Sequence, residues 1–221
     1  MELALAAAAA CPRLAAGAWA DAGTGSGCLA VGLARGLDRL AAATKPNTLG
    51  LTHSLPPVIA LDVNDAPLAY AAFNAARCGV GGRVRVLRSD WLGALSPLSG
   101  GGDAAPCLLD GLVSNPPYVP GRRVARLQRE VAAFEPRAAL DGGDSDGGGA
   151  LRALVDAAAA ALRPGAFLGL ETDGGDQARG VAELLRSAGG GAAWERVAVE
   201  SDLAGVARFV VAYRAHASVV T

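Results

Sequence analysis

The segment Asn115-Pro116-Pro117-Tyr118 has the residue types best suited to chemistry, and it follows an apolar run that ends at Val113. The run has the length of a buried strand, so Asn115 should lie at the carboxyl edge of a sheet, where open α/β folds bind ligands. Two consecutive prolines remove two N–H donors and make a stiff turn with bare carbonyls. A rigid amide beside such carbonyls can hold an NH2 group. An ordinary strand-terminating loop is the alternative, because Asn-Pro often begins a turn.

A glycine-rich turn, Asp-Ala-Gly-Thr-Gly-Ser-Gly at residues 21–27, follows an apolar segment and precedes a helix beginning at Cys28. Its glycine spacing matches neither the dinucleotide fingerprint nor the P-loop, which argues against a pyrophosphate ligand. The glycines would still let a ligand approach the backbone closely. Asp21 could accept hydrogen bonds from a cationic or hydroxylated ligand. A plain glycine-rich turn between strand and helix is the alternative.

Two more acids end predicted strands. Asp62 follows the second strand, at the place where nucleoside-binding α/β folds hold ribose hydroxyls. Asp90 and Trp91 follow the third strand, and an acid beside an aromatic ring suits adenine, whose NH2 needs an acceptor and whose ring needs a flat apolar face. Asp65 is better explained as a plain helix N-cap.

These residues must be positioned by an alternation of strands and helices. Five strand–helix units predict a mostly parallel sheet covered by helices on both faces, and the last two strands predict a terminal antiparallel hairpin. Surface loops are expected at 43–57 and 99–105. The expected strands are Leu14–Ala20, Val58–Leu61, Arg83–Leu87, Cys107–Val113, Ala166–Leu170, Trp194–Val199 and Val206–Tyr213. The expected helices are Leu3–Ala10, the one from Cys28, Leu68–Arg77, Ala150–Leu162 and Ala178–Ser187.

Composition excludes several classes of protein. A chain of 221 residues is long enough for one substantial core, and its net charge of −1 gives no global attraction to nucleic acid or an anionic membrane. The four cysteines lie far apart and only two histidines exist, so neither a metal site nor a disulfide framework is expected. No apolar run reaches membrane-spanning length.

A larger pattern carries a family resemblance. Taken in order, the 21–27 turn, Asp62, Asp90, the 115–118 tetrapeptide and the tract Glu-Pro-Arg-Ala-Ala-Leu-Asp-Gly-Gly at 135–143 resemble the catalytic domain of the release factor glutamine methyltransferases. The tetrapeptide is shared with many amino-methyltransferases, and the later tract narrows the match. The resemblance runs from about Glu2 to the C-terminus, so residues 1–221 are expected to form a single catalytic domain without the family's N-terminal helical domain.

The resemblance implies an α/β fold of the Rossmann-like class I S-adenosylmethionine-dependent methyltransferases, a seven-stranded, mostly parallel sheet with an antiparallel C-terminal hairpin. S-adenosylmethionine would be the methyl donor, and the acceptor would be the glutamine amide in the Gly-Gly-Gln loop of a peptide chain release factor. The implied catalytic residues are Asn115, Pro116, Pro117 and Tyr118. The implied cofactor-binding residues are Asp21, Gly23, Thr24, Gly25, Gly27, Asp62, Asp90, Trp91 and Asn115.

The chemistry explains this choice of residues. An amide nitrogen is a poor nucleophile, and no side chain has a pKa suited to deprotonating it beforehand. Acceptance of both N–H hydrogens by Asn115 Oδ1 and the Pro116 carbonyl would aim the lone pair at the sulfonium methyl group. Tyr118 could pack over the planar amide. The sequence departs from the family's pattern at the segment from Glu171 to Gln177, which is one residue longer than the family's spacing.

Other functions remain open at this stage. A DNA or RNA amino-methyltransferase acting on adenine N6 or guanine N2 could use the same tetrapeptide, and the arginines at 122, 123, 126 and 129 fall on a helical period that could meet RNA. A solvated helix face is the commoner meaning of such a pattern. A related protein methyltransferase and an inactive binding module are further alternatives. We expect a monomer, unattached to membranes, in the cytoplasm or in the matrix of a plastid or mitochondrion.

Overall fold

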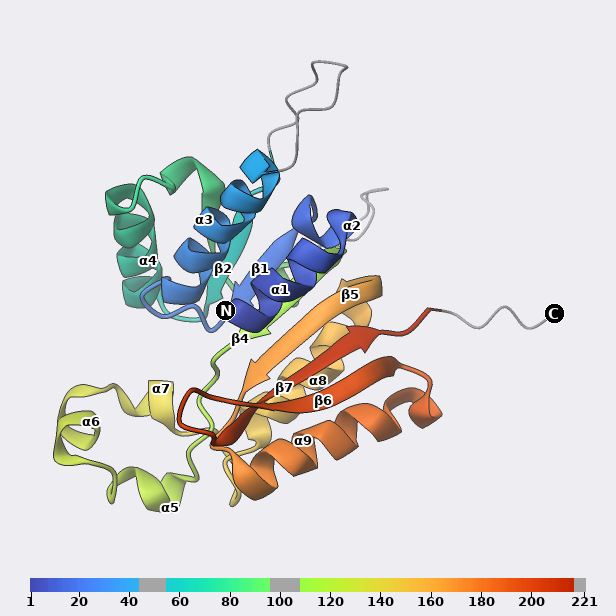
Figure 1. The fold of residues 1–221 in the computed structure, drawn as a ribbon. Helices are drawn as coiled ribbons and strands as arrows, with labels where there is room; N and C mark the ends of the chain where they lie inside the picture. Colours follow the sequence, from blue (N-terminus) through green and yellow to red (C-terminus); the bar gives the residue numbers. More distant parts are fainter. Residues whose placement is uncertain (44–54, 96–107, 217–221) are drawn as a thin grey trace, which may run out of the picture.

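A seven-stranded sheet forms the centre of the protein in a computed structural model that describes residues 1–43, 55–95 and 108–216 (Figure 1). The strand order is β3-β2-β1-β4-β5-β7-β6, and all neighbouring pairs are parallel except those made by β7. The predicted fold class is therefore confirmed, including the antiparallel last strand. The strands are β1 (Trp19–Ala22), β2 (Val58–Asp62), β3 (Val84–Arg88), β4 (Leu109–Ser114), β5 (Leu162–Glu171), β6 (Trp194–Ser201) and β7 (Ala207–Arg214).

Helices cover both faces of the sheet. The helices α1 to α4 lie on one face, and α8 and α9 lie on the other (Figure 1). No helix of the described ranges is both long and apolar enough to cross a bilayer. The α-helices are α1 (Glu2–Ala10), α2 (Pro12–Ala15), α3 (Cys28–Ala43), α4 (Asp65–Arg77), α5 (Gly121–Val124), α6 (Arg129–Phe134), α7 (Arg137–Leu140), α8 (Gly149–Ala161) and α9 (Gly175–Ser187). The short 3₁₀ helices are η1 (Gly81–Arg83), η2 (Gly93–Leu95) and η3 (Ala188–Gly191).

Alternation along the strands explains the two-sided core. In β1, Trp19 packs into the cluster under α1 to α3, whereas Ala20 faces the cluster under α8 and α9. In β2, Ala60 and Leu61 divide between the same two clusters. Because both faces are covered, the strands read as nearly continuous apolar runs, as parallel strands do. Burial of this apolar surface is the dominant favourable contribution to folding.

The N-terminal edge of the sheet is pinned by Asp110. Its carboxylate accepts hydrogen bonds from Arg13 Nη1 at 2.7 Å, from Arg163 Nη1 at 2.6 Å and from the Ala18 amide at 3.0 Å. Asp110 is buried, and two cations and an amide satisfy it. This pin joins α2, β4 and β5 at the edge opposite to the one where the predicted site residues lie.

Two sequence predictions are wrong near element ends. Leu14 lies in helix α2, and the first strand begins only at Trp19, because Pro12 starts a short helix whose last turn is closed by a hydrogen bond from Trp19 Nε1 to the Leu14 carbonyl at 2.8 Å. Asp65 is the first residue of α4, and Asn64 occupies the N-cap position without a side-chain capping bond. The predicted loops at 43–57 and 99–105, and the predicted strand start at Cys107, lie largely or wholly outside the described residues.

The four arginines that were predicted to form one basic helix face do not lie on one helix. A break at 125–128 separates α5 from α6, so the four arginines at 122, 123, 126 and 129 do not share one helix. Arg123 instead pairs with Asp173. The helical spacing in the sequence is real, but α5 contains only four residues. This weakens the one sequence feature that favoured nucleic acid.

Candidate active site

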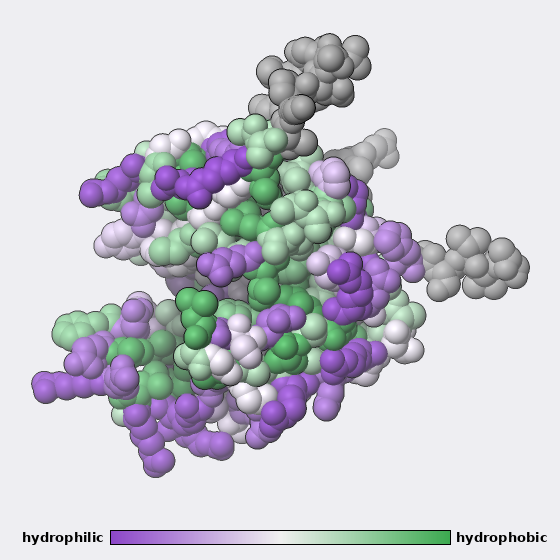
Figure 2. Space-filling view, in the orientation of Figure 1, coloured by the Kyte–Doolittle hydropathy of each residue, from purple (hydrophilic) through white to green (hydrophobic). Residues whose placement is uncertain are grey.

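Parallel register brings the predicted site residues to one edge of the sheet. Ala22 of β1 is level with Leu61 of β2 and with Ser114 of β4, so the segments after these strands leave the sheet side by side. Asp62 is level with Arg88 of β3, which places the segment with Asp90 and Trp91 next in the row. Figure 2 shows the surface hollowed on this side, between the half with α3 and α4 and the excursion with α5 to α7.

Asp21 is buried at the end of β1 with half of its carboxylate satisfied. Oδ2 accepts from Thr24 Oγ1 at 2.6 Å and from the Ala30 amide at 3.0 Å. Oδ1 is buried and has no hydrogen-bond partner in the structure. Burial raises the pKa of Asp21 to about 7, and the charge of Asp62 acts in the same direction. An orphaned acceptor of this kind beside a glycine turn suits a cationic ligand group, which would lower that pKa again.

The glycine turn is tied directly to the neighbouring strand. The Gly25 amide donates to Asp62 Oδ2 at 3.2 Å, and the Thr24 amide donates to the Leu61 carbonyl at 2.8 Å. Gly27 has a φ of +83°, and a Cβ placed on it would lie 2.9 Å from Ala71 Cα of helix α4. Only glycine meets both the conformation and the close approach at this position. The turn therefore has a fixed shape against α4.

The acids predicted to bind the nucleoside flank this turn. Asp62 is half-buried, and its Oδ1 accepts from the Asn64 amide at 3.0 Å. Asp90 is exposed, and the half-buried Trp91 has a φ of +45°. A Cβ placed on Gly23 would lie 3.7 Å from the Trp91 ring, so the indole lies against the glycine turn. The flat face predicted for an adenine is thus adjacent to the residues predicted for the rest of the cofactor.

The tetrapeptide Asn115–Tyr118 forms a corner, braced by its two prolines, that starts where β4 ends. Ser114 Oγ donates to the Ala22 carbonyl at 2.6 Å, which ties the corner to β1. The Asn115 side chain is exposed and is not turned into the core, whereas Pro116 is buried. The sequence therefore placed the amide correctly at the accessible edge of the sheet.

Tyr118 is held by its hydroxyl. Its O–H donates to Glu171 Oε1, at the end of β5, at 3.2 Å. Burial and the neighbouring Glu171 carboxylate raise the pKa of Tyr118 to about 12. The phenol is therefore protonated at neutral pH and cannot act as a base there. Glu171 was not predicted as a site residue, although it ends a strand at the same edge as Asp21 and Asp62, and that position was a usable signal.

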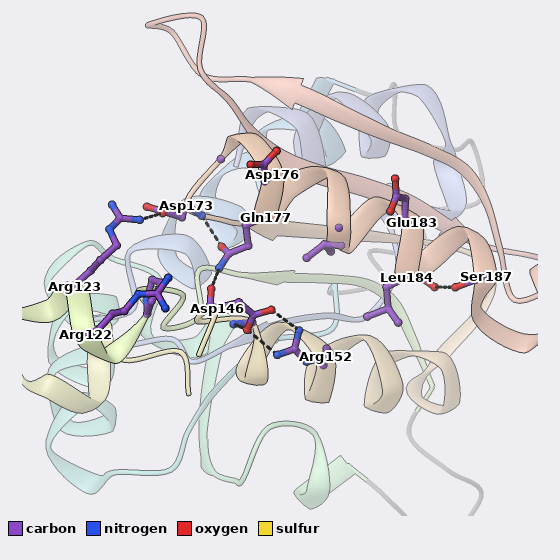
Figure 3. A pocket seen from close by; sticks show the side chains of 15 residues that line it. Arg122, Arg123, Asp146, Arg152, Asp173, Asp176, Gln177, Glu183, Leu184 and Ser187 are labelled. Carbon is purple, nitrogen blue, oxygen red and sulfur yellow. Dashed lines mark hydrogen bonds and ion pairs between the residues drawn. The ribbon is translucent and has the colours of Figure 1, made fainter. Parts of the chain in front are cut away.

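A separate groove lies beside the corner. It has a volume of about 890 Å³ and is lined mainly by α9, α5 and the loop before α8 (Figure 3). None of the predicted catalytic or cofactor-binding residues lines it. Gln177, which lines this groove, reaches the Tyr118 backbone. Among the described residues, no group of three or more His, Cys, Asp or Glu side chains is placed to hold a metal ion.

Comparisons with known proteins identify relatives along most of the chain. No protein-family model matches it. The release factor glutamine methyltransferase of a Synechocystis strain is 40% identical over 194 residues, covering 88% of this chain and 56% of the relative. The protein of the same name from Moorella thermoacetica is 40% identical over 197 residues, covering 88% of this chain and 58% of the relative. The predicted resemblance is confirmed, and the chain spans a little over half the length of these curated relatives.

Solved structures confirm the fold class alone, because their sequence identities are low. The O-methyltransferase TomG from Streptomyces achromogenes, in complex with SAM, has a TM-score of 0.57 at 16% identity, over 97% of this chain and 79% of that one. An O-methyltransferase from Bacillus cereus in complex with SAH has a TM-score of 0.56 at 13% identity, over 96% and 80%. TrmN from Thermus thermophilus has a TM-score of 0.52 at 20% identity, over 96% and 48%.

Proposed function

We propose that this chain, which resembles the release factor glutamine methyltransferases, transfers a methyl group from S-adenosylmethionine to the glutamine side-chain amide in the Gly-Gly-Gln loop of a peptide chain release factor. The observation that carries the proposal is the exposed Asn115 amide on a doubly proline-braced corner, at the same sheet edge as the Asp21 glycine turn. The 40% identity to proteins of that name supports the choice of acceptor. In this proposal residues 1–221 act as the methyltransferase domain.

The residues at the edge fit the proposed cofactor. Asp21 has a buried oxygen without a partner, which would accept from the ammonium group of the methionine part. Asp62 would meet the ribose hydroxyls, and Asp90 with Trp91 would meet the adenine. When bound, S-adenosylmethionine supplies an electrophilic methyl group on a sulfonium cation.

The corner would orient the acceptor. Asn115 Oδ1 and the Pro116 carbonyl would each accept one N–H hydrogen of the glutamine amide, which leaves its lone pair directed toward the methyl group. The same two oxygens favour the positive charge that grows on nitrogen during transfer. Tyr118, held by Glu171, would form a wall against the planar amide. Since the phenol is protonated at neutral pH, the proton leaves to water after transfer.

The test is a transfer of labelled methyl from S-adenosylmethionine. The protein is incubated with a release factor, with the same factor carrying Gln→Ala in its Gly-Gly-Gln loop, and with bulk DNA or RNA. We expect label in the first sample alone. Label in the Gln→Ala factor would move the acceptor to another residue, and label in the nucleic acid would replace the proposal with an amino-methyltransferase of bases.

A further inference from the structure

A glycine tract, residues 141–148, packs backbone against backbone behind the corner. The Val119 amide donates to the Leu140 carbonyl at 2.9 Å, and the Gly142 amide donates to the Val119 carbonyl at 3.0 Å. A Cβ placed on Gly147 would lie 2.3 Å from the Tyr118 carbonyl oxygen. The segment 135–143, which narrowed the family resemblance, therefore overlaps the glycine tract 141–148 that supports the corner.

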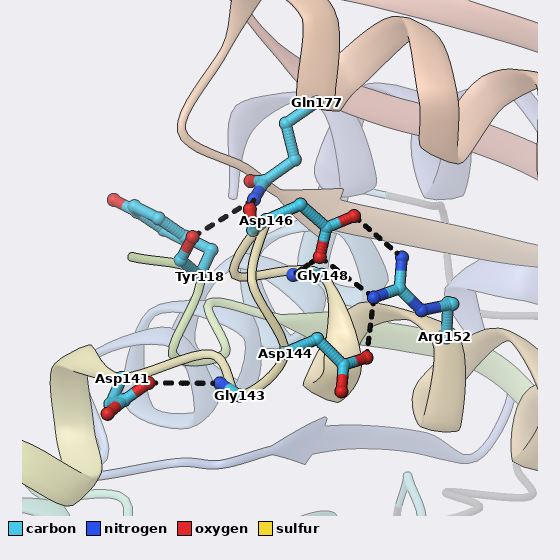
Figure 4. A network of polar contacts seen from close by, with 8 residues as sticks. All are labelled: Tyr118, Asp141, Gly143, Asp144, Asp146, Gly148, Arg152 and Gln177. Carbon is cyan, nitrogen blue, oxygen red and sulfur yellow. Dashed lines mark hydrogen bonds and ion pairs between the residues drawn. The ribbon is translucent and has the colours of Figure 1, made fainter. Parts of the chain in front are cut away.

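Gln177 joins this tract, the corner and α9 through one side chain. Its Nε2 donates to the Tyr118 carbonyl at 3.0 Å and to the Asp146 carbonyl at 3.1 Å (Figure 4). Its Oε1 accepts from the Asp173 amide at 2.8 Å, so both ends of the carboxamide are used (Figure 3). Gln177 lies 59 residues from Tyr118 in the chain and is placed by the first turn of α9.

A guanidinium clamp holds the Asp146 end of this arrangement. Arg152 Nη1 and Nη2 donate to the two carboxylate oxygens of Asp146 at 3.0 and 2.8 Å, and Nη2 also meets Asp144 Oδ2 at 2.6 Å (Figure 4). Hydrogen bonds from Arg152 and from the Gly148 amide hold the pKa of Asp146 well below its usual range. The clamp fixes the loop so that the Asp146 carbonyl meets Gln177.

The geometry points to Gln177 as a positioning residue for methyl transfer, an inference that rests on the proposed function. Tyr118 is held at two points, its hydroxyl by Glu171 and its backbone carbonyl by Gln177. The two prolines before Tyr118 make the corner stiff, so a shift at the Tyr118 carbonyl is transmitted to the Pro116 carbonyl and Asn115. Gln177 touches neither acceptor nor cofactor in this scheme and acts through the corner.

The kinetic test compares Gln177→Met with Glu183→Gln. Methionine keeps the length and bulk of the side chain and removes all three hydrogen bonds, whereas Glu183 lines the same groove on the same helix and serves as the matched control. We expect Gln177→Met to lower kcat by about 10- to 100-fold, the scale of a small misplacement of reacting groups. The KM for the release factor and the Kd for S-adenosylmethionine should change less than about threefold.

Two outcomes, one kinetic and one from binding and thermal unfolding, would overturn the inference. One is a kcat within about twofold of the parent. The other is a parallel loss of S-adenosylmethionine affinity and of Tm, which would make Gln177 merely structural. The Glu183→Gln control should match the parent protein in every measurement.

Hydrogen exchange gives a readout that does not depend on the acceptor. In Gln177→Met the amides of Val119 and Gly142 should exchange faster than in the parent, while those of α3 stay protected. If the parent protein places no label on a release factor, the proposed function fails, and exchange alone then judges Gln177. Unchanged protection at Val119 and Gly142 would show that Gln177 does not hold the corner.

Discussion

Replacing Asp21 with asparagine should remove a pH-dependent loss of stability. Asparagine has the same shape, and its Oδ1 can still accept from Thr24 Oγ1 and the Ala30 amide. Its NH2 group would take the place of the buried carboxylate oxygen that has no partner. The substitution therefore removes the charge and leaves the local packing in place.

The magnitude follows from the Asp21 pKa of about 7 in the folded protein against a reference of 3.8. A raised pKa means that the folded state binds the proton more tightly, so this contribution is fully present below pH 3.8 and is lost as pH rises through 7. Each pKa unit is worth about 1.4 kcal/mol, and the whole difference is therefore about 4 kcal/mol. Between pH 5 and pH 8 linkage gives a loss of roughly 2.5 kcal/mol.

Urea unfolding at pH 5 and pH 8 measures this loss. The free energy of unfolding of the parent should fall more than that of Asp21→Asn by roughly 2.5 kcal/mol over this interval. Subtracting the two proteins cancels the other titrating groups. Equal pH dependence in parent and variant would refute the assignment of the raised pKa to Asp21. The variant should also bind S-adenosylmethionine more weakly, because an amide offers the ligand no negative charge.

Three further substitutions, one of them a matched control, test the corner and its support. Asn115→Ala should lower turnover by about 10² or more, as loss of one preorganised polar group does, while S-adenosylmethionine still binds in calorimetry; near-normal turnover would remove Asn115 from the mechanism. Gly147→Ala and Gly143→Ala both force a side chain into a positive φ, at +73° and +70°, but only at Gly147 does the Cβ meet backbone. Thermal unfolding should show the Gly147 variant less stable than the Gly143 variant by at least about 1 kcal/mol, and equal Tm values would contradict the packing described.

The position of the site at the carboxyl ends of the strands was predictable, because a polar residue follows or ends each of these strands. Asp21, Asp62 and Asn115 each follow or end an apolar run, and the rule that parallel strands share a carboxyl edge brings them together. The antiparallel last strand was also expected, from two strand-like runs joined by a short turn. These inferences depend on local patterns, which a single sequence displays.

What the sequence did not reveal depends on contacts between distant residues. Leu14 is a buried apolar residue of helix α2, and an apolar residue would be buried equally well in a strand. Its hydrophobicity therefore could not decide between the two. In the sequence, Asp110 is a single polar residue within the predicted strand Cys107–Val113. In the structure it pairs with Arg13 and Arg163, which lie 97 and 53 residues away in the chain. Gln177 likewise carries no local signal for its bond to Tyr118.

The excursion that contains α5, α6 and α7 spans residues 120–140, and two hydrogen bonds and a parallel bridge from Val119 to Asp141 close its base. A loop whose two ends are hydrogen-bonded together can change length or composition at its far end without disturbing the residues at its base. Substitutions beyond this base would therefore reshape the surface of the excursion, while the corner from Asn115 to Tyr118 keeps its shape.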